Sequence, residues 1–232
     1  MKIIDKIKYF LIHKIQFNDE RKKFQLVIDE FDRNISILEV GCGNGRNLVM
    51  LKKMGFVNVK GIDINTKLVQ KANSFGVAAF AIDEKKKWNQ KYDLLIFSHI
   101  IEHFQHKELK QFLEDYFIYS INRSKIIIST PTDNKSFYYD FDHVKPYHPN
   151  GILMVFSKNI QQVQFNSNIQ LGLDEFYFYK EQYRLRMFRS IVLNRKSFVH
   201  IINGIFQIIY NLSRGKIGEI TGWIGVFSLN RE

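Results

Sequence analysis

The sequence predicts an α/β fold built on a doubly wound, mostly parallel sheet of seven strands. Short apolar segments alternate along the chain with segments of helical periodicity, which is typical of strands covered by helices on both faces. A glycine-rich turn follows the first expected strand, at the kind of position where such sheets bind ligands. The expected strands cover residues 35–40, 58–63, 77–82, 92–97, 125–130, 169–179 and 222–229.

Length and composition indicate one domain. A chain of 232 residues with 45% hydrophobic residues is long enough for one sizeable core and short for two. This domain has three expected parts, which are N-terminal helices over 1–34, a core over 35–131, and a C-terminal part over 132–232. The C-terminal part is expected to contain a long loop, a helical insert and the last strands.

Two N-terminal segments, 3–16 and 19–33, carry apolar residues at helical spacing and are expected to cover the sheet. Lysines and a histidine interrupt the apolar runs of the first segment, so the sequence predicts no signal peptide. No segment is expected to cross a membrane. The single cysteine, Cys42, excludes an intrachain disulfide and suits a reducing compartment, so we expect a cytoplasmic protein.

The chain carries an excess of positive charge. Lys and Arg number 34 against 23 Asp and Glu, which gives a formal net charge of +11 at pH 7. Such a field attracts anionic partners, for example nucleic acid, anionic lipid head groups or phosphorylated substrates. A lysine-biased composition without any such partner is the alternative explanation.

The glycine-rich turn contains Gly41, Gly43 and Gly45, which permit positive φ angles and leave the backbone open to a ligand. A helix beginning near Asn44 would point free N–H groups at that ligand. Residue 46 is arginine, so the spacing departs from the NAD fingerprint, and the Gly-Lys-Ser/Thr ending of a Walker loop is missing. A glycine-rich turn without a ligand is the structural alternative.

Polar residues also follow the other strands of the core. The second strand ends at Asp63, 22 residues after Gly41, which is close to the spacing of ribose-binding carboxylates in α/β folds. A helix capped by Asn65 or Thr66 follows it, and a later helix is expected over 107–120. Because the carboxyl ends of parallel strands share one edge, their residues form one set: Glu39, Asp63, Asp83, Ser98, His99, Thr130 and Pro131.

Taken together, residues 35–131 resemble the class I S-adenosylmethionine-dependent methyltransferases. The matching pieces are, in order, Glu39 with the G-x-G-x-G loop, GIDIN at 61–65, an acidic residue after the third strand, YDLLIFSHIIEHF at 92–104 and KIIISTP at 125–131. Within this class the chain looks most like enzymes of the quinone-biosynthesis type, which act on small molecules, lipids or sugars. The Glu-His pair after the fourth strand and the HVKP stretch at 143–146 both look like theirs.

The resemblance implies a Rossmann-like methyltransferase fold with an antiparallel last strand, and S-adenosyl-L-methionine as the cofactor. It implies that the three glycines pack against the cofactor, that Glu39 lies near its methionyl amine and that Asp63 binds its ribose. Asp83 or Glu84 would meet the adenine amino group. The other cofactor-binding residues that we predict are Cys42, Ile64, Ser98 and His99. Carboxylates complement this cofactor because it is a cation without phosphate.

The implied reaction moves a methyl group to a small-molecule, sugar or lipid-linked acceptor, with oxygen as the favoured acceptor atom. The protein would position the acceptor and provide a base for its proton. His103, His143 and His148 are candidates because imidazole titrates near neutral pH, and we predict His103 and His143 as the catalytic pair. Packed or surface histidines are the structural alternative. An RNA methyltransferase and a cofactor-binding scaffold without turnover are the alternative functions. No separate RNA-binding module is visible in the sequence, so nucleic acid is not the expected partner.

Residues 99–103, HIIEH, match the H-x-x-E-H pattern of zinc proteases, whose ligands share one face of a helix. Here His99 follows the end of a strand, so the two imidazoles are expected to point in different directions. We therefore predict no metal ligands.

The insert contains an expected helix over 197–213 with a narrow polar stripe and a wide apolar face. The segment is too short to span a bilayer, and basic residues flank it. This pattern fits a helix lying in a membrane interface, so that 184–216 would make a peripheral contact at the inner face of the membrane. Packing on the sheet, or on the second subunit of a homodimer, is the alternative. The flanking basic residues are Arg184, Arg186, Arg189, Arg195, Lys196, Arg214 and Lys216.

Overall fold

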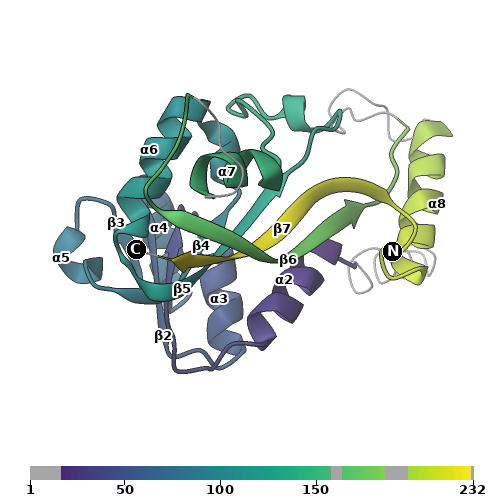
Figure 1. Cartoon of the computed structure of the whole chain (residues 1–232). Coiled ribbons are helices and arrows are strands. Elements are labelled where there is room, and N and C mark those ends of the chain that lie inside the picture. Colours follow the sequence, from purple (N-terminus) through teal and green to yellow (C-terminus); the bar gives the residue numbers. More distant parts are fainter. Residues whose placement is uncertain (1–16, 158–163, 186–197, 231–232) are drawn as a thin grey trace.

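The computed structural model describes residues 17–157, 164–185 and 198–230 (Figure 1). Its centre is a seven-stranded sheet in the order β3-β2-β1-β4-β5-β7-β6. The last strand, β7, runs antiparallel to both of its neighbours, and the pairs among β1 to β5 are parallel. The predicted fold is therefore confirmed. The strands are β1 (Ser36–Val40), β2 (Asn58–Asp63), β3 (Ala79–Ala81), β4 (Tyr92–Ser98), β5 (Ser120–Pro131), β6 (Gln170–Glu181) and β7 (Glu219–Asn230).

Helices fill the segments between the strands, as the helical periodicity predicts. The helix predicted over 3–16 lies outside the described residues, as do Arg186, Arg189, Arg195 and Lys196. None of the described helices has the length and apolar character that a membrane span requires. The helices are α2 (Asp19–Asp29), α3 (Arg46–Lys53), α4 (Thr66–Ser74), α5 (Lys85–Trp88), η1 (Ile101–His103), α6 (His106–Phe117), η2 (Phe137–Tyr139), α7 (Pro149–Phe156) and α8 (Phe198–Leu212).

Neighbouring residues of each central strand point to opposite faces of the sheet, and both faces are buried. Ile37 and Leu94 pack on one face with α2 and α3, whereas Leu38 and Leu95 pack on the other with α6 and α7 (Figure 1). All four side chains have no exposed surface. Burial on both faces explains why these strands read as continuous apolar runs in the sequence.

Local features explain where three of these elements begin. The strand β5 begins at Ser120 rather than at 125. The prediction missed its first part because this part is polar, and it pairs with an irregular register and contains a left-handed Arg123 (φ 63°). The helix α7 begins at Pro149, where a proline costs no hydrogen bond, and the side chain of His148 caps it. The amide oxygen of Asn65 caps α4, which settles the choice between Asn65 and Thr66.

The helix α8 stands beside the sheet, near the end of β6 (Figure 1). Of its side chains that the structure describes, only Tyr210 is buried. The Tyr210 hydroxyl donates to the Lys180 carbonyl at 2.6 Å, and its ring meets Phe17 edge-on at 5.9 Å. One face of α8 remains exposed, with Ile201, Ile205, Ile208, Ile209 and Leu212 all more than a third accessible.

Candidate active site

The glycine turn after β1 has the backbone geometry that only glycine adopts readily. Gly41, Gly43 and Gly45 have φ angles of 73°, 53° and 77°. A Cβ atom at Gly45 would lie 2.8 Å from the Ala72 Cβ, so this glycine allows α3 and α4 to pack closely. A Cβ atom at Gly43 would meet nothing within 4 Å. Gly45 thus serves the fold, whereas Gly43 faces open space that a ligand can enter.

Asp63 holds this turn in place. Its Oδ2 accepts a hydrogen bond from the Gly43 N–H at 2.8 Å, and its Oδ1 accepts one from the Asn65 N–H at 2.7 Å. Each carboxylate oxygen can accept a second bond, and the side chain is only half-buried. Asp63 can therefore bind ligand hydroxyls while it fixes the glycine loop, a structural role that its spacing did not predict.

Glu39 is a buried carboxylic acid with one free oxygen. Its Oε1 accepts from the Asn47 amide at 2.7 Å, whereas its Oε2 has no hydrogen-bond partner among the described residues. Burial raises the pKa of Glu39 to about 8, and the Asn47 bond only partly opposes this rise. A cationic group placed at Oε2 would satisfy the free acceptor. Sequence reasoning missed Asn47, although it lies within the first two turns of α3.

Two predicted carboxylates follow β3, and the structure separates them. Glu84 accepts from the Ala81 N–H at 3.0 Å and forms an ion pair with Lys87, so its oxygens already have partners. The exposed Asp83 carboxylate makes no hydrogen bond or ion pair with the described residues. Ile64, at the end of β2, is 83% exposed. Asp83 and Ile64 are thus the freer of these side chains to meet a ligand.

Cys42 and Ser98 contribute little side-chain surface to this edge. The Cys42 side chain is 6% exposed and packs in a small core with Leu48 and Val69, where burial raises the pKa of its thiol. Ser98 ends β4 and is 8% exposed. Any contact of Cys42 with a ligand is therefore expected through its backbone.

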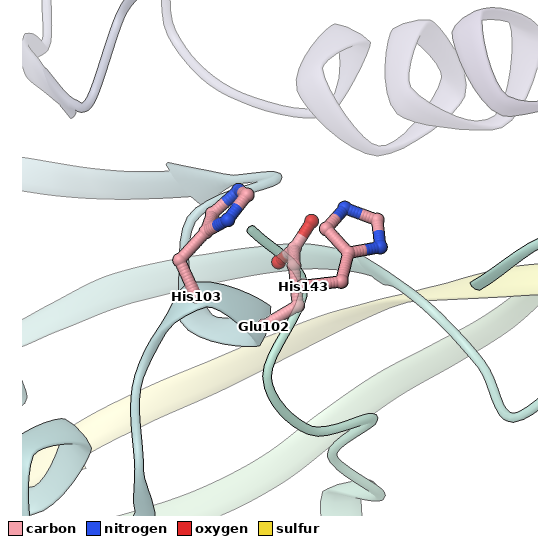
Figure 2. Close-up of side chains that lie close together, drawn as sticks. All are labelled: Glu102, His103 and His143. Atoms are coloured by element: carbon pink, nitrogen blue, oxygen red, sulfur yellow. The ribbon is translucent and has the colours of Figure 1, made fainter. Parts of the chain in front are cut away.

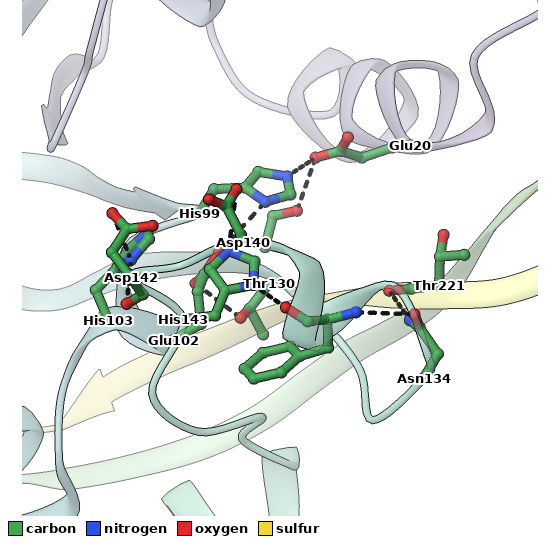
Figure 3. A network of polar contacts seen from close by, with 12 residues as sticks. Glu20, His99, Glu102, His103, Thr130, Asn134, Asp140, Asp142, His143 and Thr221 are labelled. Carbon is green, nitrogen blue, oxygen red and sulfur yellow. Dashed lines mark hydrogen bonds and ion pairs between the residues drawn. The ribbon is translucent and has the colours of Figure 1, made fainter. Parts of the chain in front are cut away.

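His99 lies in a polar network that ties α2 to the edge of the sheet (Figure 3). Its Nε2 lies 2.6 Å from Glu20 Oε1, and its Nδ1 lies 3.4 Å from Glu102 Oε1. Burial alone would lower the pKa of His99, but the carboxylates of Glu102 and Glu20 raise it to about 10. Ser129 donates to the same Glu20 oxygen at 3.2 Å. His99 thus binds protein carboxylates, and its ring holds α2 against β4 and β5.

The structure brings His103 and His143 together across two segments that are far apart in sequence (Figure 2). His103 ends η1, His143 lies in the loop after β5, and the ring centroids are 5.1 Å apart. The N–H groups of Val144 and Lys145 both donate to the Glu102 carbonyl, at 2.8 and 3.2 Å. These backbone bonds hold the loop against η1.

Besides Asn47, two residues near the histidines were not predicted as functional. Glu102 is completely buried between the predicted histidines, and its position in the stretch 92–104 was the available signal. Glu20 comes from α2 and carries no local signal, because only tertiary packing brings it to His99. The third candidate base, His148, lies at the start of α7 and accepts from the Asn150 N–H at 3.2 Å.

Comparison with known proteins gives a family. The family described as "Methyltransferase domain" matches residues 8–163. No curated protein sequence matches the chain. A crystal structure of a SAM-dependent methyltransferase from Archaeoglobus fulgidus is 20% identical, covering 95% of this chain and 99% of that chain with a TM-score of 0.57.

A second structure, the magnesium protoporphyrin IX methyltransferase of Synechocystis PCC 6803 with bound SAH, is 14% identical. It covers 100% of this chain and 89% of that chain with a TM-score of 0.53. At these identities the likeness concerns the fold. The order of the strands and the antiparallel β7 agree with this fold.

Proposed function

This chain belongs to the methyltransferase-domain family, and we propose that it transfers a methyl group from S-adenosyl-L-methionine to a small-molecule, sugar or lipid-linked acceptor. Oxygen is the proposed acceptor atom. The observation that carries the proposal is the buried Glu39 carboxyl, whose Oε2 has no hydrogen-bond partner in the described part of the chain and lies beside the open backbone of Gly43. A cation without phosphate fits this edge, whereas a pyrophosphate would meet the carboxylates of Asp63 and Asp83.

In the proposal, each residue on the cofactor side of this edge of the sheet has a separate task. Glu39 accepts from the methionyl ammonium, and the backbone of Gly43 lies along the cofactor because no Cβ intervenes. Asp63 accepts from the ribose hydroxyls with its remaining lone pairs. Asp83 accepts from the adenine amino group, since Glu84 is engaged by Ala81 and Lys87.

The remaining residues at this edge of the sheet bind the acceptor in the proposal. Bound cofactor supplies a methyl group that is already activated on a sulfonium, so the protein has to position the acceptor and remove its proton. His103 and His143 lie together where β4 and β5 end, next to the strand ends that carry the cofactor residues. We assign them to the removal of the acceptor proton.

Mass spectrometry tests the proposal. Small-molecule extracts, lipid extracts and total RNA are incubated separately with the protein and a cofactor that carries an isotope-labelled methyl group, and labelled products are sought. The proposal expects a labelled product that disappears when Glu39→Gln and Asp63→Ala are combined. Label appearing only in RNA would favour the RNA methyltransferase that the +11 charge allows. Bound cofactor without any labelled product would favour a scaffold.

A further inference from the structure

Glu102, His103 and His143 form a cluster of side chains suited to a metal ion (Figure 2). One ligand atom from each lies within 4.8 Å of the others. Glu102 and His103 come from η1 and His143 from the loop after β5. The backbone bonds of Val144 and Lys145 to the Glu102 carbonyl fix these two segments against each other. The cluster is therefore built by the fold and does not depend on one flexible side chain.

Hydrogen bonds orient both imidazoles for metal binding. His143 Nδ1 lies 2.9 Å from the Phe137 carbonyl, and His103 Nδ1 lies 3.1 Å from the Asp142 carbonyl. A carbonyl oxygen only accepts, so Nδ1 of each ring carries the proton. The Nε2 atom of each ring is then the nitrogen that can face a metal ion, and that of His143 lies 3.9 Å from Asp140 Oδ2. Metal-binding histidines are commonly oriented in this way, with the other ring nitrogen donating to a carbonyl.

Glu102 supplies an oxygen ligand that lacks a full partner. Its side chain has no exposed surface, and its Oε2 accepts from the Thr130 hydroxyl at 2.9 Å (Figure 3). Its Oε1 makes no hydrogen bond with any residue that the structure describes, although His99 Nδ1 lies 3.4 Å away. The single His99 ring is shared by Glu102 and Glu20.

We propose that Glu102, His103 and His143 bind one divalent transition-metal cation at the acceptor side of the site. Two imidazoles and one carboxylate suit manganese, iron, cobalt or zinc, whereas magnesium and calcium prefer an all-oxygen shell. Three protein ligands leave coordination positions open for a substrate. His99 is not part of this set, since its Nε2 is bound to Glu20 and its Nδ1 faces Glu102.

This inference rests on the proposed function and specifies the acceptor. A hydroxyl oxygen of the acceptor binds the cation, which lowers the hydroxyl pKa, and the proton leaves to water. The oxygen then forms the new O–CH₃ bond as the S–CH₃ bond of the cofactor breaks, and the electron pair of that bond stays on sulfur. The negative charge of the oxygen and the positive charge of the sulfonium cancel. The acceptor class is thus one with a metal-binding hydroxyl, such as a vicinal diol or catechol. In this arrangement His103 and His143 act as metal ligands and not as the base, so they promote loss of the proton through the cation.

The test measures metal binding in the absence of cofactor and acceptor. Tag-free protein treated with a chelator is titrated separately with Zn²⁺, Co²⁺ and Mn²⁺ by calorimetry, and the visible absorption of Co²⁺ reports its coordination. The inference expects one cation per chain for at least one of these ions. Glu102→Gln, His103→Ala and His143→Ala should each weaken binding by about tenfold or more.

His106→Ala is the matched control, because His106 begins α6, the helix that follows η1 in the chain, and does not belong to the cluster. It should bind the cation as the unmodified protein does. Circular dichroism and S-adenosylhomocysteine (SAH) binding show that each variant is folded. Absence of stoichiometric binding of all three ions overturns the inference, as does unchanged binding in the three cluster variants. SAH binding without cation binding overturns this inference and leaves the proposed function standing. Cation binding without SAH binding overturns the proposed function.

Discussion

At the scale of single residues, Glu39 is buried, and its Oε2 has no hydrogen-bond partner among the described residues. Its pKa of about 8 in the free protein means that the carboxyl holds its proton at neutral pH. A cationic ligand at Oε2 favours the ionised form, so cofactor binding is coupled to loss of this proton. The coupling is a direct signature of the proposed contact.

We expect SAH to bind with release of close to one proton at pH 7, and its affinity to rise with pH until about pH 8. Binding favours the deprotonated form, and deprotonation becomes cheaper as the pH approaches the pKa. Calorimetry in two buffers of different ionisation enthalpy gives the proton number. Glu39→Gln should remove both the proton release and the rise in affinity. Proton release that persists in this variant would assign it to another group.

The histidine pair makes a second prediction at this scale. His143→Ala should lower turnover by about 10²-fold or more while SAH affinity stays within about twofold, because the ring lies at the acceptor side. Steady-state kinetics on the identified acceptor and calorimetry with SAH measure the two quantities. His148→Asn is the control, since asparagine can cap α7 in place of His148. Full turnover in both His103→Ala and His143→Ala would show that neither residue assists the reaction.

At the scale of elements, a comparison of two glycines distinguishes an effect on folding from an effect on ligand binding. Gly43 and Gly55 both have positive φ angles, 53° and 94°, and a Cβ at either would meet nothing within 4 Å. Gly55 lies in the turn before β2, at the opposite edge of the sheet from the proposed site. The two glycines therefore form a matched pair.

Gly43→Ala and Gly55→Ala should each lower the free energy of unfolding by about 1 to 2 kcal/mol, the cost of a left-handed residue with a Cβ. Only Gly43→Ala should weaken SAH binding, by about tenfold or more, since the added methyl group enters the proposed ligand space. Denaturant titration and calorimetry give the two values. Equal SAH affinity in both variants would place the cofactor away from this loop.

The exposed face of α8 carries the prediction of peripheral membrane contact. Ile205 and Ile208 are each 50% exposed, and the basic Arg214 and Lys216 follow the helix. Sedimentation with anionic liposomes at low salt should recover the protein, since each basic residue near anionic lipid contributes about 1 kcal/mol. Ile205→Asp combined with Ile208→Asp should abolish recovery. The control Val57→Asp should not, since Val57 is 70% exposed and lies outside α8, in the segment before β2. Recovery of the double variant would instead favour contact through charge alone or through another surface.

At the scale of the whole molecule, the sequence predicted what local patterns encode. Ile37 and Leu38 sit in an apolar run that a strand buried on both faces requires, so the number of strands and their positions along the chain could be predicted, whereas their order in the sheet was not. The glycine turn and Asp63 were found because their spacing is local. The ion pair of His99 with Glu20 joins residues 79 positions apart, and no periodicity signals it.

The histidine cluster shows the same limit. Both His103 and His143 were candidates as isolated residues, but their tautomers depend on the carbonyls of Asp142 and Phe137. Those contacts exist only once the loop after β5 has folded against η1. Sequence reasoning therefore supplied the chemical groups, and the tertiary structure supplied their mutual orientation.

The central claim is that the edge formed by Glu39, Gly43 and Asp63 binds S-adenosyl-L-methionine. Calorimetry with SAH and, separately, with NAD tests it most directly, using the unmodified protein and Asp63→Ala. The account predicts one SAH per chain, no saturable NAD binding, and a loss of about 1 to 3 kcal/mol in SAH binding for Asp63→Ala. Saturable NAD binding without SAH binding, or an SAH affinity that Asp63→Ala leaves unchanged, would contradict it.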